Sequence, residues 1–270
     1  MSRQTIHSVF KSLREKKRIG VIPFIPAGYP DLETTAAAIT ALDSAGASVI
    51  EIGFPFSDPI ADGPVIQEAF TAALQKHLKI ADIFQTIRSV GRDLSAPLVA
   101  MVSYSIVFRY GTAKFFADAR GAGFDGMIIP DLPPPEAQPV CRMMREADLQ
   151  SILLIAPTTA PQRRREIASL CTGFVYYLSV SGITGERDLL PPGLSAAVTE
   201  IRGMTDRPVC VGFGLHRVEQ IRQLAKFADG AIVGSAIVRR MKERAADGST
   251  GVAQAVGDYL RELTAGTATI

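Results

Sequence analysis

The sequence contains few of the residues on which disulfide-bonded or metal-bound proteins depend. Its 270 residues include no tryptophan, three cysteines and three histidines. An odd number of cysteines without a Cys-x-x-Cys pair argues against a disulfide framework and favours a reducing cytoplasm as the location. The histidines stand far apart and lack metal-ligand spacing, so we expect no metal site among His7, His77 and His216.

Long hydrophobic runs and a large excess of either charge are also missing. No uncharged apolar stretch of about 18 residues occurs, so we expect no transmembrane helix. Residues 1–20 lack the apolar segment of a secretory signal. The 29 Lys and Arg residues against 27 Asp and Glu give a net charge of +2, which indicates neither nucleic acid nor membrane as a partner. Hydrophobic residues make up 47% of the chain, which excludes disorder as its main state.

Short β-branched runs alternate with helix-length segments along the whole chain. One such segment repeats apolar residues from Leu32 to Leu42 with helical spacing, and Asp31 is its expected N-cap. Eight runs in a chain of this length predict an α/β fold, namely one (β/α)8 TIM barrel domain over 1–270. The runs are Ile19–Ile25, Ser48–Phe54, Leu98–Val102, Gly126–Pro130, Ser151–Ile155, Phe174–Ser179, Pro208–Phe213 and Gly230–Gly234.

The N-terminal segment predicts one helix more than the barrel requires. Ile6, Val9, Phe10 and Leu13 suggest an amphipathic helix before the first strand. A doubly wound open sheet is the alternative fold. It is disfavoured because such sheets usually have fewer strands and because no Gly-x-Gly-x-x-Gly follows the first strand.

An acidic cluster follows the second expected strand, at the end of a barrel where chemistry is located. Glu51 shares one strand face with Val49 and Gly53. If that face points into the barrel, burial raises the pKa of the Glu51 carboxyl, as a general acid and base near neutrality requires. Pairing of Glu51 with an Arg or Lys is the alternative. The loop beyond adds Asp58 and Asp62, although an Asp in such a loop is also a common turn former.

Glycine-containing loops end the last strands and suggest a phosphate site. Gly212-Phe213-Gly214 ends the seventh strand, and Gly234-Ser235 ends the eighth, before a short helix expected over 236–244. Backbone N–H groups at the start of a helix favour anions. A third loop, 179–185, is rich in hydroxyl groups and long enough to form a lid. We therefore expect these loops to bind a phosphate group.

No lysine lies in an expected strand. This argues against a Schiff-base aldolase and against covalently held pyridoxal phosphate. Acid/base chemistry on a phosphorylated small molecule remains as the expected activity.

These motifs resemble those of the tryptophan synthase alpha subunit family over essentially the whole chain. The stretch from Glu51 to Pro59 is close to diagnostic, whereas the glycine pairs suit many phosphate-binding barrels. The segment Ser103-Tyr104-Ser105-Ile106 departs from the family, whose members often carry a Tyr and an Asn there, and Pro26 stands where a Thr is common. The matching segments are Pro26–Asp31, Glu51–Pro59, Ala61–Pro64, Pro130–Pro133, Gly182–Gly185, Gly212–Gly214 and Gly234–Ser235.

The resemblance implies a lyase of tryptophan biosynthesis that splits indole-3-glycerol phosphate into indole and glyceraldehyde 3-phosphate by a retro-aldol reaction. It implies that Glu51 transfers protons and that Asp62 holds the indole N–H. It implies no chemistry for Asp131, which matches a family position near the subunit interface. It implies phosphate contacts at Gly185, Gly214, Gly234 and Ser235, and pocket walls at Tyr177, Thr184 and Phe213.

The resemblance also implies a cytoplasmic α2β2 heterotetramer with a β subunit that carries pyridoxal phosphate, while this chain holds no cofactor of its own. The proline-rich segments 55–64 and 130–139 are the expected docking surfaces, because stiff loops lose little entropy on binding. Two alternatives remain open: a stand-alone lyase that releases free indole, and a phosphate-binding barrel that mainly activates a partner enzyme.

Overall fold

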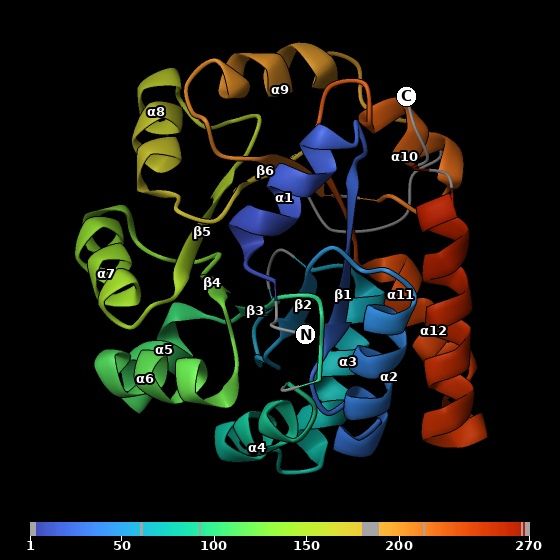
Figure 1. Cartoon of the computed structure of the whole chain (residues 1–270). Coiled ribbons are helices and arrows are strands. Elements are labelled where there is room, and N and C mark those ends of the chain that lie inside the picture. Colours follow the sequence, from blue (N-terminus) through green and yellow to red (C-terminus); the bar gives the residue numbers. More distant parts are fainter. Residues whose placement is uncertain are drawn as a thin grey trace.

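In the computed structural model, which describes residues 4–59, 62–91, 93–179, 189–212, 214–265 and 267, eight parallel strands form a closed barrel (Figure 1). Their order around the barrel is their order in the sequence, and β8 pairs back to β1. Each strand overlaps one of the runs predicted above, so the TIM barrel is confirmed. The strands are β1 (Gly20–Pro26), β2 (Ile50–Gly53), β3 (Leu98–Met101), β4 (Gly126–Ile128), β5 (Gln150–Ile155), β6 (Val175–Leu178), β7 (Val209–Gly212) and β8 (Gly230–Val233).

Helices surround the strands on all sides (Figure 1). The predicted N-cap of α2 is confirmed, because the Asp31 carboxylate accepts a hydrogen bond from the Thr34 backbone N–H at 2.7 Å. The helices are α1 (Ile6–Glu15), α2 (Leu32–Ser44), α3 (Pro64–Gln75), α4 (Ile80–Val90), α5 (Tyr104–Tyr110), α6 (Thr112–Ala122), α7 (Pro134–Glu146), α8 (Pro161–Leu170), α9 (Leu194–Arg202), α10 (Val218–Leu224), α11 (Ser235–Glu243), the short 3-10 turn η1 (Ala245–Asp247) and α12 (Gly248–Ala265).

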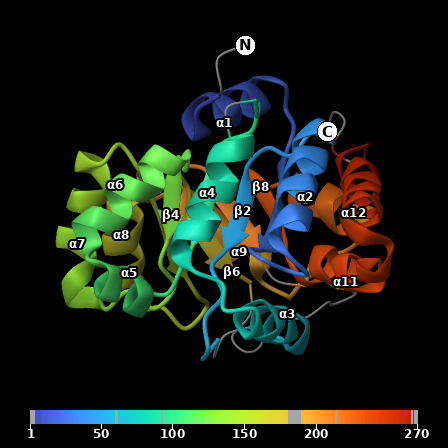
Figure 2. The ribbon, with the colours of Figure 1, turned by 90° about the horizontal axis from the view of Figure 1, so that it is seen from below.

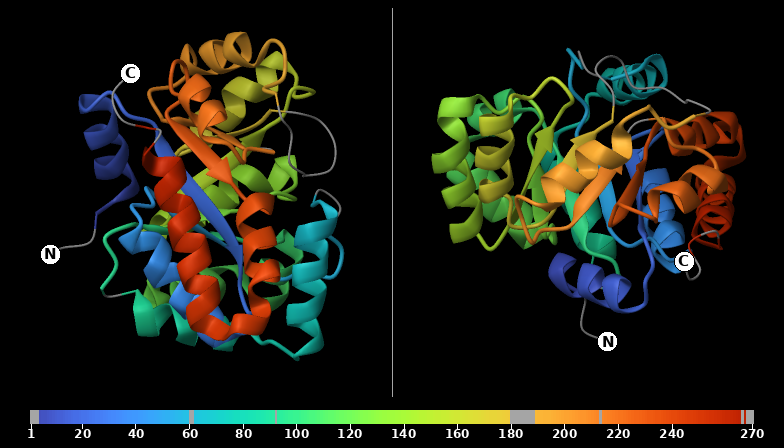
Figure 3. Two further views of the ribbon diagram at one scale, coloured as in Figure 1. Left: turned by 90° about the vertical axis from the view of Figure 1, so that its right-hand side faces the viewer. Right: turned by 90° about the horizontal axis from the view of Figure 1, so that it is seen from above.

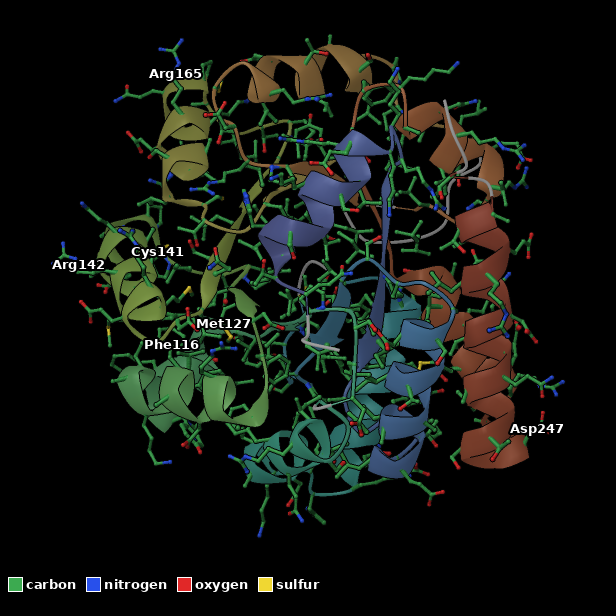
Figure 4. All side chains as sticks on the ribbon, viewed as in Figure 1. Phe116, Met127, Cys141, Arg142, Arg165 and Asp247 are labelled. Atoms are coloured by element: carbon green, nitrogen blue, oxygen red, sulfur yellow. The ribbon has the colours of Figure 1, made fainter. Side chains whose placement is uncertain are left out.

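Strand residues alternate between the barrel interior and the layer between strands and helices. The interior holds a separate apolar cluster, which includes Val49, Val99, Ile152 and Ile232. The outer layer is the larger core. Met127 and Cys141 are buried in it, whereas Arg142 of α7 and Arg165 of α8 extend away from the molecule (Figure 4). The three cysteines are free and buried.

The predicted N-terminal helix α1 closes one end of the barrel. Its Ile6 and Phe10 belong to the interior cluster, and the Phe10 ring lies 5.9 Å from the Phe174 ring. The Arg14 side chain adds a hydrogen bond of 2.8 Å from Nε to the buried Asp229 carboxylate. Figure 2 shows α1 at one end of the barrel and α3 at the opposite end. Leu13 and Ile6 of α1 lie against Gly20 and Gly126, the first residues of β1 and β4, so the carboxyl-terminal ends of the strands remain available for a site.

The long C-terminal helix α12 runs along the outside of the barrel and packs against α2 (Figure 3). Its apolar face includes Val252, Val256, Leu260 and Leu263, all fully buried. Among the helices of the described residues, none combines the length and the apolar character that crossing a bilayer requires.

Candidate active site

Glu51 points from β2 into the barrel, near the carboxyl-terminal ends of the strands. It pairs in register with Phe24 of β1 and Val99 of β3, and its side chain is 1% exposed. Neither carboxyl oxygen has a hydrogen-bond partner among the described residues, so no pairing with an Arg or Lys is found there. Burial raises the pKa of the Glu51 carboxyl to about 8, and the nearby Asp62 carboxylate adds to the rise. At neutral pH this carboxyl therefore carries a proton.

Asp62 enters the same cavity from the loop between β2 and α3. Burial raises the pKa of its carboxyl to about 6. Between pH 6 and pH 8 the site therefore holds a protonated Glu51 beside an ionised Asp62. Two carboxyl groups with separated pKa values can serve as a proton donor and as a stabilising anion.

Both carboxyl groups line one cavity of about 120 Å³ at the mouth of the barrel. Most of its wall is apolar and partly aromatic, which suits a flat aromatic ligand. The sequence did not point to these wall residues, because apolar side chains of buried strands look alike in a sequence. They include Phe24, Ile66, Met101, Leu154, Tyr176 and Ile232.

Two inward-facing glycines make room for the aromatic residues of this cavity. A Cβ atom on Gly53 would lie 2.5 Å from Phe24 Cζ, and one on Gly212 would lie 2.5 Å from the Tyr176 hydroxyl oxygen. Real Cβ atoms do not approach other atoms this closely. The absence of side chains at these two positions therefore lets the Phe24 and Tyr176 rings reach into the barrel mouth.

The lining of the cavity also includes three of the expected phosphate contacts: Gly214, Gly234 and Ser235. Helix α11 begins at Ser235, close to the predicted range, and no side chain of the described residues caps its N-terminus. The first N–H groups of a helix have no partner inside it, so this end is suited to an anion. Gly214 has φ +73°, a left-handed conformation that favours glycine.

The structure corrects one expected pocket residue. Tyr177 lies outside the cavity, in the core between barrel and helices, and the neighbouring Tyr176 lines the cavity instead. The reason is the strand period of two, which turns Phe174 and Tyr176 inward and Tyr177 outward. This alternation was available in the sequence. Three further expected residues, Thr184, Gly185 and Phe213, lie outside the described residues.

A second cavity, of about 210 Å³, adjoins the first and shares Asp62, Met101 and Pro130 with it. Asp58 and Asp131 also line this second cavity. The Asp131 carboxylate accepts hydrogen bonds from Ser103 Oγ at 2.6 Å and from the Tyr104 backbone N–H at 2.7 Å. Asp131 therefore holds the start of α5, in the segment 103–106. It lines the second cavity and not the one that contains Glu51.

No group of three or more His, Cys, Asp or Glu side chains in the described part of the chain is arranged to hold a metal ion. Strands β1 to β8 also contain no lysine. Among the residues that the structure describes, the polar groups of the cavity include the two carboxyls, the Tyr176 and Ser235 hydroxyls and the N–H groups at the start of α11.

Comparison with known proteins identifies relatives of the whole chain. The family model "Tryptophan synthase alpha chain" matches residues 10–267. The chain is 42% identical to the tryptophan synthase alpha chain of Synechocystis over 259 residues, which cover 96% of this chain and 97% of the relative. It is 43% identical to that of Rhodopirellula baltica over 268 residues, 96% of each chain. A solved structure of Mycobacterium tuberculosis tryptophan synthase matches with a TM-score of 0.87, 36% identity and full coverage of both chains.

Proposed function

The chain belongs to the tryptophan synthase alpha chain family, and on this premise we propose that it is a carbon–carbon lyase acting on indole-3-glycerol phosphate. The products are indole and glyceraldehyde 3-phosphate. The observation that carries the proposal is the buried Glu51 carboxyl, which lacks a partner among the described residues and lies with Asp62 in one cavity at the barrel mouth. Burial of a carboxyl group without a hydrogen-bond partner lowers the stability of the folded protein. Such a group therefore indicates a catalytic role rather than a structural one.

In the proposed reaction Glu51 first acts as an acid. Its proton goes to the indole ring carbon that carries the side chain, and the positive charge that develops on the ring nitrogen is stabilised by the Asp62 carboxylate. Glu51, now ionised, takes the proton of the hydroxyl group on the adjacent side-chain carbon. The carbon–carbon bond breaks, its electron pair returns to the ring, and the hydroxyl carbon becomes the aldehyde. Glu51 ends protonated, so the cycle needs no external acid or base.

The substrate phosphate is proposed to bind at the start of α11, to Gly234 and Ser235, with Gly214 beside them. Support comes from the uncapped helix start in the cavity wall, where N–H groups and the helix dipole both favour an anion. Gly185 remains a proposed fourth contact. The indole ring is proposed to lie against Phe24 and Tyr176, two of the aromatic residues of the wall.

We further propose that the chain acts in the cytoplasm within an α2β2 heterotetramer, whose β subunit carries the pyridoxal phosphate and receives the indole. The surface around the second cavity supports a docking role. Phe108 of α5 is 68% exposed, and its ring lies 6.0 Å from that of Tyr104, beside the proline-rich segment 130–139. Exposed aromatic residues next to stiff loops are typical of interface anchors.

The substitution Glu51→Gln tests the proposed chemistry, because it keeps the size of the side chain and removes its proton transfer. We expect the rate of indole release to fall by about 10²- to 10⁴-fold. Binding of glycerol 3-phosphate, measured by calorimetry, should stay unchanged, since the start of α11 is untouched. Wild-type activity in this variant would refute the role of Glu51. A wild-type chain that is inactive both alone and with a β subunit would refute the function itself.

A further inference from the structure

The side-chain amide of Gln67, in the N-terminal part of α3, holds the loop that carries Asp62. Gln67 Nε2 donates a hydrogen bond of 2.8 Å to the Asp62 backbone carbonyl and a longer one of 3.4 Å to the Pro59 carbonyl. Within the loop, the Asp62 N–H donates to the same Pro59 carbonyl at 3.1 Å. One amide group therefore joins both ends of the turn from Pro59 to Asp62.

The side chain of Gln67 adds donors to a segment that contains proline. Pro55 and Pro59 in the loop, and Pro64 at the start of α3, have no N–H group to donate. The Gln67 amide therefore supplies donors from outside the loop backbone to the carbonyl groups of Pro59 and Asp62.

Helix α3, from which Gln67 projects, is itself well anchored. Ile66 and Phe70 on either side of Gln67 are 4% and 5% exposed, and the Phe70 ring lies 6.4 Å from that of Phe24. Lys242 of α11 adds an ion pair of 2.7 Å to Glu68. The Gln67 amide therefore connects the Asp62 loop to an element packed against the cavity wall.

We propose that Gln67 is a positioning residue for Asp62, whose carboxylate it keeps in the cavity beside Glu51. The inference rests on the proposed function for its effect on turnover, but the contact between Gln67 and the loop is independent of it. Gln67 is exposed and does not line the cavity, so it touches no reacting atom. It acts only through the backbone of Asp62.

Loss of the Gln67 amide should lower the pKa of the Asp62 carboxyl, an effect that general destabilisation of the fold would not produce. With the loop released, the Asp62 carboxyl gains access to water, and its pKa falls from about 6 toward the usual aspartate range. The other titratable groups that line the two cavities are Glu51 on β2, Tyr176 on β6, Asp131 after β4 and Asp58 in the same loop. Glu51, Tyr176 and Asp131 stay in place, and the Glu51 pKa also falls as the Asp62 carboxylate moves away. The start of α11 is also unchanged, so substrate affinity should be retained.

The test compares Gln67→Met, which keeps the length of the side chain but has no donor, with Gln75→Met as a matched control. Gln75 is an exposed glutamine at the other end of the same helix. In the complex with the β subunit, Gln67→Met should lower kcat by about 10- to 100-fold and leave KM within about twofold. The acidic limb of the pH profile should move to lower pH, and Gln75→Met should match the wild type. Equal kcat values and pH profiles for Gln67→Met and wild type would overturn the proposal.

A second measurement does not depend on turnover. The Asp62 carboxyl is titrated by carbon NMR in wild type and in Gln67→Met, and its pKa should be lower in the variant. If the wild type fails to cleave indole-3-glycerol phosphate, the proposed function fails, and this titration still decides the role of Gln67. Gln67→Leu, which has no donor and adds no charge beside Asp62, replaces Gln67→Met if the latter does not fold. An unchanged Asp62 titration in the folded variant would contradict the positioning role.

Discussion

Glu51 and Asp62 are both carboxylic acids, yet burial gives them different pKa values, about 8 and about 6. Glu51 points into the barrel and is fully enclosed, whereas Asp62 reaches the cavity from a loop at its rim. The proposed reaction starts from a protonated Glu51 and an ionised Asp62. These two requirements fix the direction of the pH dependence on each side of the optimum.

The kcat/KM value should follow a bell-shaped pH profile, because this quantity reports on groups of the free enzyme. As pH falls through about 6, Asp62 gains a proton and can no longer stabilise the charged indole ring. As pH rises through about 8, Glu51 loses the proton that it must donate. The maximum therefore lies between these values. Measurement of indole release from pH 5 to pH 9 checks the profile, and a rate that keeps rising above pH 8 would contradict this assignment.

Strand alternation places Glu51 on one face with Val49 and Gly53, but the sequence left open whether that face points into the barrel. The same alternation puts Tyr176 on the cavity side of β6, where Tyr177 was expected. Gln67 gave no signal at all. A polar residue near the start of a helix is ordinary, and its contact with the Asp62 carbonyl depends on a loop conformation that the sequence does not specify.

Helix α11 begins at the proposed phosphate site, so a charge introduced at its first residue should change phosphate binding. Ser235 is buried in the cavity wall, so Ser235→Asp places a charge at a buried position, and the helix dipole offsets part of that cost. The same carboxylate would repel the substrate phosphate. Thermal unfolding of the variant therefore accompanies the binding measurement.

We expect Ser235→Asp to raise KM for indole-3-glycerol phosphate by about 10-fold or more, the cost of a lost hydrogen bond to a charged group. The melting temperature should fall, because the new carboxylate is buried, and KM is measured below the unfolding transition. Thr250→Asp is the control, because Thr250 is exposed in the first turn of α12 and lies outside the cavity. If steady-state kinetics give the same KM for Ser235→Asp and the control, the phosphate binds elsewhere.

Helix α1 has a structural task at the end of the barrel opposite α3 (Figure 2). Phe10 is 1% exposed and fills the base of the barrel against Phe174. Phe10→Ala should lower the free energy of unfolding by about 3–5 kcal/mol, as large core truncations do. Denaturant unfolding measures this loss. Phe108→Ala, at an exposed position, should change the same quantity by less than about 0.5 kcal/mol.

The activity of the folded Phe10→Ala variant should equal that of the wild type below its unfolding transition. The reason is that Phe10 contacts the interior cluster and lines neither cavity. A large drop in kcat in fully folded protein would mean that the two ends of the barrel are coupled.

The barrel as a whole was predictable because strands that are buried on both faces read as continuous apolar runs. Eight of them, separated by helix-length segments, leave few other folds. Helices α1 and α11 were also expected, from the Ile6–Phe10 spacing and from the glycine loop before Ser235. The organisation of 1–270 as one domain stays a prediction, which the packing of α12 against α2 supports.

The two cavities could not be derived from the sequence. Their shape depends on how Phe24 and Tyr176 pass over Gly53 and Gly212, which come from four different strands. Such contacts combine residues that are distant in the chain. The acidic residues of the site were therefore foreseeable from the sequence, whereas the shape of the cavities was not.

The most direct measurement is the rate of indole release from indole-3-glycerol phosphate by the purified chain, alone and with a tryptophan synthase β subunit. We predict slow release by the chain alone and much faster release in the complex, because a partner docked near the second cavity would add contacts to a wall that includes Asp62. Fast release without the partner would favour a stand-alone lyase. No release under either condition, with Glu51 and Asp62 intact, would contradict the proposed function.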